Sequence, residues 1–177
     1  MDEIEVKILE INKEEIEKKL LELGAEKIFD DELRALMFDL PDQSIANSGR
    51  MLRIRQEGEK AVLTFKKLKS DQGIKIAEET EVDISSFEDT KKILEGLGFQ
   101  VYFEYKKHRI SYELEGVEFE IDTPAGELSD IPTFLEIEAK TEEKVYEWVE
   151  KLGFTKEDCK GYGLNGLLKH YGKSTPG

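Results

Sequence analysis

Charged and apolar residues alternate along many short segments of this chain, and this alternation limits the fold more than any other feature. Residues 3–8, for example, read Glu-Ile-Glu-Val-Lys-Ile. Successive side chains of a β-strand point to opposite faces of the sheet. Each segment of this kind therefore predicts a strand with one charged face and one apolar face.

The pattern predicts strands near residues 2–9, 34–39, 50–56, 60–67, 75–84, 101–113, 116–122 and 133–139. Apolar residues recur at helical spacing in residues 13–23, 86–97, 142–152 and 163–171. Asn12 is a good N-cap for the first of these helices. No linker or change of composition divides the chain, so we expect one domain over residues 1–172, followed by a tail at 173–177.

The charged faces of the strands can point either to bulk solvent, in an open sheet, or into the interior of a barrel. An open antiparallel sheet commonly alternates in this way. Here, however, the charged face consists almost entirely of carboxylates, guanidinium groups and ammonium groups, and neighbouring like charges repel unless something neutralises them. Eight strands are enough to close a barrel around inward side chains. We therefore expect an α+β fold: a closed eight-stranded antiparallel β-barrel with amphipathic helices packed outside.

A charged interior needs ion pairs, water, metal ions or an anionic ligand, because burying an isolated charge is costly. Clustered carboxylates without His or Cys suit hard cations such as Mg²⁺ or Mn²⁺. Clustered Arg and Lys suit phosphate, since Arg can bind two of its oxygens at once. Together the two sets indicate a metal-complexed polyphosphate.

Composition excludes several other classes of protein. The net charge of −14 argues against a nucleic-acid partner, which needs a basic face. The chain has no apolar run long enough to span a membrane and its N-terminus does not resemble a signal peptide, so we expect a cytoplasmic protein without a membrane partner. Its single cysteine, Cys159, cannot form an internal disulfide.

An ordered set of motifs resembles the CYTH superfamily, the triphosphate tunnel metalloenzymes that include class IV adenylyl cyclases and thiamine triphosphatases. The set begins with Glu3-Ile4-Glu5-Val6-Lys7, which matches the family's E-x-E-x-K signature. It continues with Leu52-Arg53-Ile54-Arg55, Leu63-Thr64-Phe65-Lys66, Glu79-Thr80-Glu81, Lys107-His108-Arg109, Glu120-Ile121-Asp122, Leu135-Glu136-Ile137-Glu138, and Lys160 with Tyr162. The resemblance spans residues 3–171.

The resemblance implies an eight-stranded tunnel with two-metal chemistry on triphosphates, and it assigns roles to individual residues. The implied metal ligands are Glu3, Glu5, Asp122, Glu136 and Glu138. The implied phosphate-binding bases are Lys7, Arg53, Arg55, Lys66, Lys107, Arg109 and Lys160. Glu3, Glu5, Lys7, Glu136 and Glu138 form the implied catalytic set, and Glu79, Glu81 and Glu120 are further tunnel acids. Mg²⁺ or Mn²⁺ would neutralise phosphate charge and activate water for attack on the terminal phosphorus.

The segment Phe38-Asp39-Leu40-Pro41 resembles one that is common in triphosphatase-like members, which favours hydrolysis. We therefore expect a metal-dependent triphosphatase acting on inorganic triphosphate, a nucleoside triphosphate or thiamine triphosphate. Two alternatives stay open: a class IV adenylyl cyclase that makes cyclic AMP and pyrophosphate, and a non-catalytic polyphosphate- or nucleotide-binding protein. The expected partner is a small-molecule triphosphate, and the chain is expected to act as a monomer or a homodimer.

Overall fold

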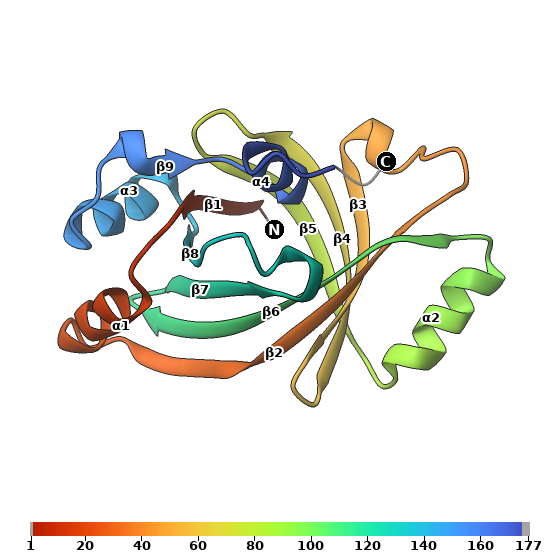
Figure 1. Cartoon of the computed structure of the whole chain (residues 1–177), viewed down its shortest axis with the longest axis horizontal. Helices are drawn as coiled ribbons and strands as arrows, with labels where there is room; N and C mark the ends of the chain where they lie inside the picture. The colour runs from red at the N-terminus through yellow and green to blue at the C-terminus, as the bar shows by residue number, and fades with distance from the viewer. Residues whose placement is uncertain (1, 175–177) are drawn as a thin grey trace.

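The computed structural model describes residues 2–174, within which nine strands form one antiparallel sheet that closes on itself (Figure 1). The strands are β1 (Asp2–Ile8), β2 (Glu26–Asp39), β3 (Arg50–Glu57), β4 (Lys60–Ser70), β5 (Lys75–Ile84), β6 (Gln100–Leu114), β7 (Val117–Ala125), β8 (Phe134–Ala139) and β9 (Cys159–Lys160). Their order in the sheet is β5-β4-β3-β2-β6-β7-β8-β1-β9.

The barrel closes where β1 pairs with β5, from Asp2 opposite Glu78 to Glu5 opposite Lys75. On its other edge, β1 pairs with β8. This confirms the predicted closed eight-stranded antiparallel barrel. The two-residue strand β9, which was not predicted, extends the sheet beside Lys7 and Ile8.

The helices are α1 (Lys13–Glu22), α2 (Phe87–Gly96), α3 (Glu142–Lys151) and α4 (Leu164–His170), with 3-10 turns η1 (Ala46–Ser48), η2 (Gly126–Leu128) and η3 (Lys156–Asp158). The helices α1, α2 and α3 lie outside the barrel, whereas α4 contributes residues to the lining of its cavity, and all four lie where the sequence predicts to within a residue or two. The Asn12 side chain accepts a hydrogen bond from the backbone N–H of Glu15, as expected of an N-cap. Gly24, after the end of α1, has a φ of +91°, which glycine adopts without strain.

The apolar strand faces point outward and are buried beneath these helices. Ile16 and Leu20 of α1 and Trp148 of α3 share one cluster with Val6 of β1 and Ile137 of β8. These alternate residues of β1 and β8 are fully buried, which leaves the charged residues between them on the inner face. Burying side chains of this size from water contributes about 1.5–3 kcal/mol each.

A second cluster joins α2 to the neighbouring part of the barrel. Phe87 and Leu94 of α2 pack against Leu36 of β2 and Ile54 of β3. The helices leave part of the barrel wall uncovered, because Phe65 on β4 keeps 39% exposure.

A third cluster joins α4 and η2 to the start of β8. Leu167 of α4 packs with Leu128 of η2 and Phe134 of β8. Within residues 2–174, none of the helices has the length and apolar character needed to cross a membrane.

The strand β2 is longer than predicted, since it begins at Glu26 rather than near residue 34. Residues 26–32 are mostly exposed, so they carry no alternation of buried and exposed side chains. A register shift between Lys27 and Phe29 also interrupts the two-residue period. The predicted domain boundary at residue 172 stays a prediction, and residues 175–177 of the predicted tail lie outside the described part of the chain.

Candidate active site in the barrel cavity

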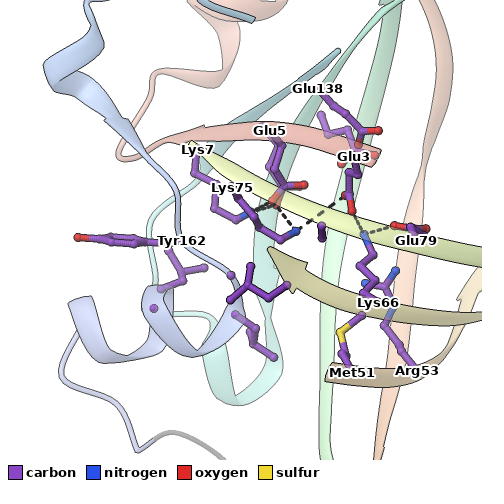
Figure 2. A pocket seen from close by; sticks show the side chains of 18 of the residues that line it. Glu3, Glu5, Lys7, Met51, Arg53, Lys66, Lys75, Glu79, Glu138 and Tyr162 are labelled. Atoms are coloured by element: carbon purple, nitrogen blue, oxygen red, sulfur yellow. Dashed lines mark hydrogen bonds and ion pairs between the residues drawn. The ribbon is translucent and has the colours of Figure 1, made fainter. Parts of the chain in front are cut away.

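The barrel encloses a cavity of about 750 Å³ that is lined by inward side chains from the strands and from α4. Its charged lining from the predicted set consists of Glu3, Glu5, Lys7, Arg53, Arg55, Lys66, Glu79, Glu81, Lys107, Arg109, Glu120, Glu136 and Glu138. Figure 2 shows Glu3 and Glu5 projecting from one strand toward Lys66 and Lys75. The alternation along the strands thus brings acids and bases from distant parts of the chain into one space.

Three carboxylates form the first acidic group of the cavity. Glu3, Glu5 and Glu138 each place a carboxylate oxygen within 4.8 Å of the other two. Glu5 and Glu138 face each other directly across β1 and β8. Since Glu3 and Glu5 lie on β1 and Glu138 lies on β8, the pairing of these two strands creates this group.

Lysine ammonium groups surround the first acidic group. Lys7 Nζ lies 2.7 Å from Glu5 Oε1, and Lys75 Nζ lies 3.1 Å from the same oxygen. Lys66 Nζ lies 2.5 Å from Glu3 Oε2 and also pairs with Glu79. Glu138 has no basic side chain within ion-pair distance among the described residues, so its charge is the least compensated of the three.

The second acidic group lies beside the first, on β7 and β8. Glu120, Asp122 and Glu136 place their carboxylate oxygens within 4.8 Å of one another. Arg109 donates two hydrogen bonds to Asp122, from Nε to Oδ1 and from Nη2 to Oδ2, each 2.7 Å long. Arg109 also pairs with Glu120, and Lys107 pairs with Asp122. The fully buried Asp122 is therefore held by two bases from β6.

Burial and the neighbouring carboxylates shift the pKa values of the acids in the two groups in different directions. Burial, together with Glu3 and Glu120, raises the pKa of Glu138 to about 9. Burial likewise raises the pKa of Glu120 to about 8, and Arg109 only partly opposes it. For Glu5, burial is outweighed by Lys7 and Lys75, which lower its pKa to about 2. Glu120 and Glu138 thus hold protons at neutral pH, where a cation would allow them to ionise.

The donors in both groups fit a hard divalent cation. Every donor is a carboxylate oxygen, which Mg²⁺ and Mn²⁺ prefer, and the sets contain no His or Cys. The predicted ligands Glu3, Glu5 and Glu138 fall in the first group, and Asp122 and Glu136 fall in the second. Glu120, predicted only as a tunnel acid, joins the second group.

One predicted base does not meet the others in the cavity. Lys160 pairs with Lys7 across β9 and β1, but its Nζ donates to the carbonyl oxygen of Glu157 at 2.9 Å, and it does not line the cavity. Lys160 is the last residue of β9, so its position on the strand did not direct its ammonium group into the cavity. Its role as a phosphate contact stays a prediction.

The predicted site omitted Lys75 and Tyr105, and both line the cavity. Lys75 shares its strand face with Glu79 and Glu81, so parity along β5 could have found it. Tyr105 precedes Lys107 on β6 with the same parity, but an aromatic residue on a strand usually packs in a core.

The segment Phe38-Asp39-Leu40-Pro41 shapes the rim of the cavity. Phe38 is fully buried under α2, so it faces away from the cavity. The carboxylate of Asp39 accepts backbone N–H groups from Leu40 at 2.7 Å, Ile45 at 3.0 Å and Ala46 at 2.8 Å. Asp39 thereby fixes the loop that carries the rim residue Ala46.

The sequence and the structure are both similar to known proteins. A family model for the CYTH domain matches residues 1–160. A Methanocaldococcus jannaschii protein, named as a candidate adenylate cyclase, is 32% identical over 137 residues, which cover 77% of this chain and 74% of the relative.

Solved structures share the fold. The PH1012 protein of Pyrococcus horikoshii is 28% identical, with a TM-score of 0.76 over 91% of this chain and 96% of that one. A Hippeastrum protein, described as a candidate adenylyl cyclase with a dominant triphosphatase activity, is 22% identical, with a TM-score of 0.68 over 98% of each chain. The match to the CYTH domain covers most of the sequence and includes the strands that carry both acidic groups, so this chain belongs to the CYTH domain family.

Proposed function

We propose that the chain is a metal-dependent phosphohydrolase that acts on a triphosphate held in the barrel cavity. The observation that carries the proposal is the meeting of two carboxylate groups with a row of bases in one cavity. Carboxylates alone would suit a cation, and bases alone would suit an anion. Their combination suits an anion that enters together with a divalent cation.

The two acidic groups would hold Mg²⁺ or Mn²⁺, with Glu3, Glu5 and Glu138 in one and Glu120, Asp122 and Glu136 in the other. When bound, such a cation neutralises phosphate charge and lowers the pKa of bound water. Lys7 supports both groups, because its Nζ lies 2.7 Å from Glu5 and 3.0 Å from Glu136. It orients the two carboxylates and sits where a phosphate oxygen can reach it.

The arginines and lysines of the cavity would bind the phosphate oxygens. Arg53 and Arg55 point inward from β3, and Lys107 and Arg109 point inward from β6. A guanidinium group can bind two oxygens of one phosphate, so arginines on different strands can fix the direction of the chain of phosphates. A fixed direction is what an in-line attack on the terminal phosphorus requires.

Hydrolysis requires fewer positioned groups in the cavity than cyclisation does. Hydrolysis needs the triphosphate and a positioned water. Cyclisation also needs the ribose 3′-hydroxyl held in line with the α-phosphorus, which calls for dedicated sugar and base contacts. The charged residues described above account for the phosphate and metal requirements alone.

An adenylyl cyclase is the second candidate, and two observations favour it. The Methanocaldococcus jannaschii relative carries an adenylate cyclase name. The lining of the cavity also includes apolar side chains, among them those of Met37, Met51 and Leu68, against which an organic substituent could pack. These side chains are equally compatible with hydrolysis of a nucleoside or thiamine triphosphate.

Product analysis tests the proposal. The purified chain is incubated with ATP and, separately, with inorganic triphosphate in Mg²⁺ or Mn²⁺, and the products are separated by chromatography. We expect phosphate as the main product. Cyclic AMP as the dominant product from ATP, with no turnover of inorganic triphosphate, would establish the cyclase. Tight binding of both compounds without turnover would establish a non-catalytic binding protein. A cytoplasmic location, and action as a monomer or a homodimer, stay predictions.

A further inference from the structure

Arg53 differs in its partners from the other buried and half-buried bases of the cavity. Each of those lies within ion-pair distance of a carboxylate; these bases are Lys7, Arg55, Lys66, Lys75, Lys107 and Arg109. Arg53 has no such carboxylate among residues 2–174, although it is only 8% exposed. Its Nε and Nη2 atoms are buried without a hydrogen-bond partner in the described part of the chain. One edge of this guanidinium group is therefore left for an anion.

The other side of Arg53 is held by a phenol. Arg53 Nη1 donates to Tyr105 Oη at 3.3 Å. The Tyr105 ring packs against the cluster that contains Leu128, Phe134 and Leu167, which fixes the position of its hydroxyl. Since the oxygen accepts from Arg53, its own O–H proton is left to donate, and no described residue accepts it.

We propose that Tyr105 is a positioning residue for the bound phosphoryl group: its oxygen holds Arg53, and its O–H proton is presented to the anion that Arg53 binds. This inference rests on the proposed function only in taking the ligand to be a phosphoryl anion. It adds a residue that none of the charged motifs contains. Tyr105 lines the cavity and contacts Arg53, so it would fix where along the barrel a phosphoryl group is held.

The surroundings of Tyr105 make this role sensitive to pH. Burial raises its pKa, but Arg53, Lys107 and Arg55 outweigh that effect and bring the pKa to about 8. The other groups around the ring are apolar residues of η2, β8 and α4, the opposite residue Ala35 of β2, and Tyr102, whose pKa is raised to about 12 by burial and by Asp39.

Loss of the Tyr105 proton has two consequences for binding. The phenolate can no longer donate to a phosphate oxygen, and its negative charge compensates Arg53. Both changes weaken binding of an anion, so the affinity should fall as the pH rises through about 8.

The test compares Tyr105→Phe with Tyr102→Phe, a matched change on the same strand that removes a cavity hydroxyl without touching Arg53. Binding of inorganic triphosphate is measured by calorimetry in Mg²⁺ directly after mixing, and KM and kcat are measured separately, on both sides of pH 8. We expect Tyr105→Phe to bind about tenfold more weakly at neutral pH and to lose the weakening at higher pH. Tyr102→Phe should behave as the wild type does.

A second readout follows the phenol itself. Near-ultraviolet absorbance of the wild type, minus that of Tyr105→Phe, reports the ionisation of Tyr105, and saturating triphosphate should move its midpoint to higher pH because the bound anion disfavours the phenolate. An unchanged midpoint, or a Tyr105→Phe protein with the wild-type affinity and pH profile, overturns the inference and leaves the proposed function intact. A wild-type chain that binds no triphosphate overturns both.

Discussion

At the scale of single residues, the bases of the cavity differ in whether a carboxylate neutralises them. A base that is paired with a carboxylate supports the structure of the cavity, and a base without one is available to bind a ligand. Lys7, with carboxylates on both sides, serves the structure of the cavity even without a ligand. Arg53 is buried without a carboxylate partner, which costs free energy in the empty protein. A bound anion would recover that cost, so the two residues should respond differently to mutation.

Replacing Arg53 with alanine should weaken triphosphate binding by about 1.5–3 kcal/mol, the usual value of a charge-assisted hydrogen bond. The free energy of unfolding should change little or increase, because the mutation removes a buried cation without leaving a carboxylate unpaired. Calorimetry and urea unfolding measure the two quantities. Lys18→Ala is the control, since the Lys18 side chain is 75% exposed on α1. Equal losses of affinity in both variants would mean that binding reports overall charge rather than a site.

The Glu138 carboxylate is the best position at which to test the metal requirement. Glu138→Gln should abolish activation by Mg²⁺ or Mn²⁺ while the protein stays folded, because Glu138 lacks an ion pair among the described residues and faces Glu5 instead. Activity is followed during metal titration after treatment with chelator, and folding by circular dichroism. Glu136→Gln is the comparison: it should lower the unfolding temperature more, because Glu136 pairs with Lys7 and Arg109. Full activity of the wild type in excess chelator would contradict the metal requirement.

At the scale of elements, the loop between β2 and β3 depends on one carboxylate. Asp39 accepts three backbone N–H groups from this loop while only 3% of its surface is exposed. The N–H groups of Leu40, Ile45 and Ala46 bond to this carboxylate, whereas those of Gln43, Asn47, Ser48 and Gly49 bond to carbonyl oxygens within the loop. It also supplies part of the cavity rim, so its order bears on binding.

Asp39→Ala should lower the free energy of unfolding by about 2 kcal/mol, because it leaves buried backbone donors unsatisfied. Urea unfolding measures the loss. Asp42→Ala, in the same loop, is the control: the Asp42 side chain accepts from Ser44 N at 3.1 Å on the surface, where a hydrogen bond should contribute little. If the two variants were equally stable, the three bonds to Asp39 would not be what orders the loop.

At the scale of the whole molecule, closing the barrel confines many like charges, and this links stability to pH. The pKa values of Glu120 and Glu138 are raised to about 8 and about 9 from the usual 4.5. At pH values between 4.5 and these raised pKa values, the two carboxyl groups have lost their protons in the unfolded chain but keep them in the folded chain. The unfolded state is favoured increasingly as the pH rises, so stability should fall from pH 4.5 to about 9. Glu5 acts in the opposite sense at lower pH, since its pKa of about 2 adds stability that is lost as the pH falls from 4.5 toward 2.

Without metal, the unfolding temperature of the wild type should therefore decrease from mildly acidic to alkaline pH. The unfolding temperature of Glu138→Gln should decrease less over the same range, because one of the two protonated acids is gone. Adding Mg²⁺ should reduce the slope in the wild type, since a bound cation favours the ionised carboxylates. Calorimetric unfolding at a series of pH values, in chelator and in Mg²⁺, measures all three. An identical slope in the wild type and in Glu138→Gln would mean that Glu138 already ionises normally in the fold.

The sequence by itself determined which side chains face inward. A strand reverses the direction of its side chains at each residue, so the parity of Glu3 and Glu5 against Val6, or of Arg53 and Arg55 against Ile54, follows from local geometry. The helices followed in the same way from their spacing, and the first of them also from its N-cap, Asn12. Residues 26–32, which lack alternation, and the short strand β9 were not predicted as strands.

Tertiary structure decided which inward groups meet. Glu138 joins Glu3 and Glu5 because β8 pairs with β1 in one particular register, and Lys75 reaches Glu5 because β5 closes the barrel there. Pairing between distant strands also left Arg53 without a carboxylate and placed Tyr105 beside it, while Lys160 turned to a backbone carbonyl. The period of a strand fixes the side on which a residue lies. Its partners depend on the register between strands, which is set by packing and turns along the whole chain.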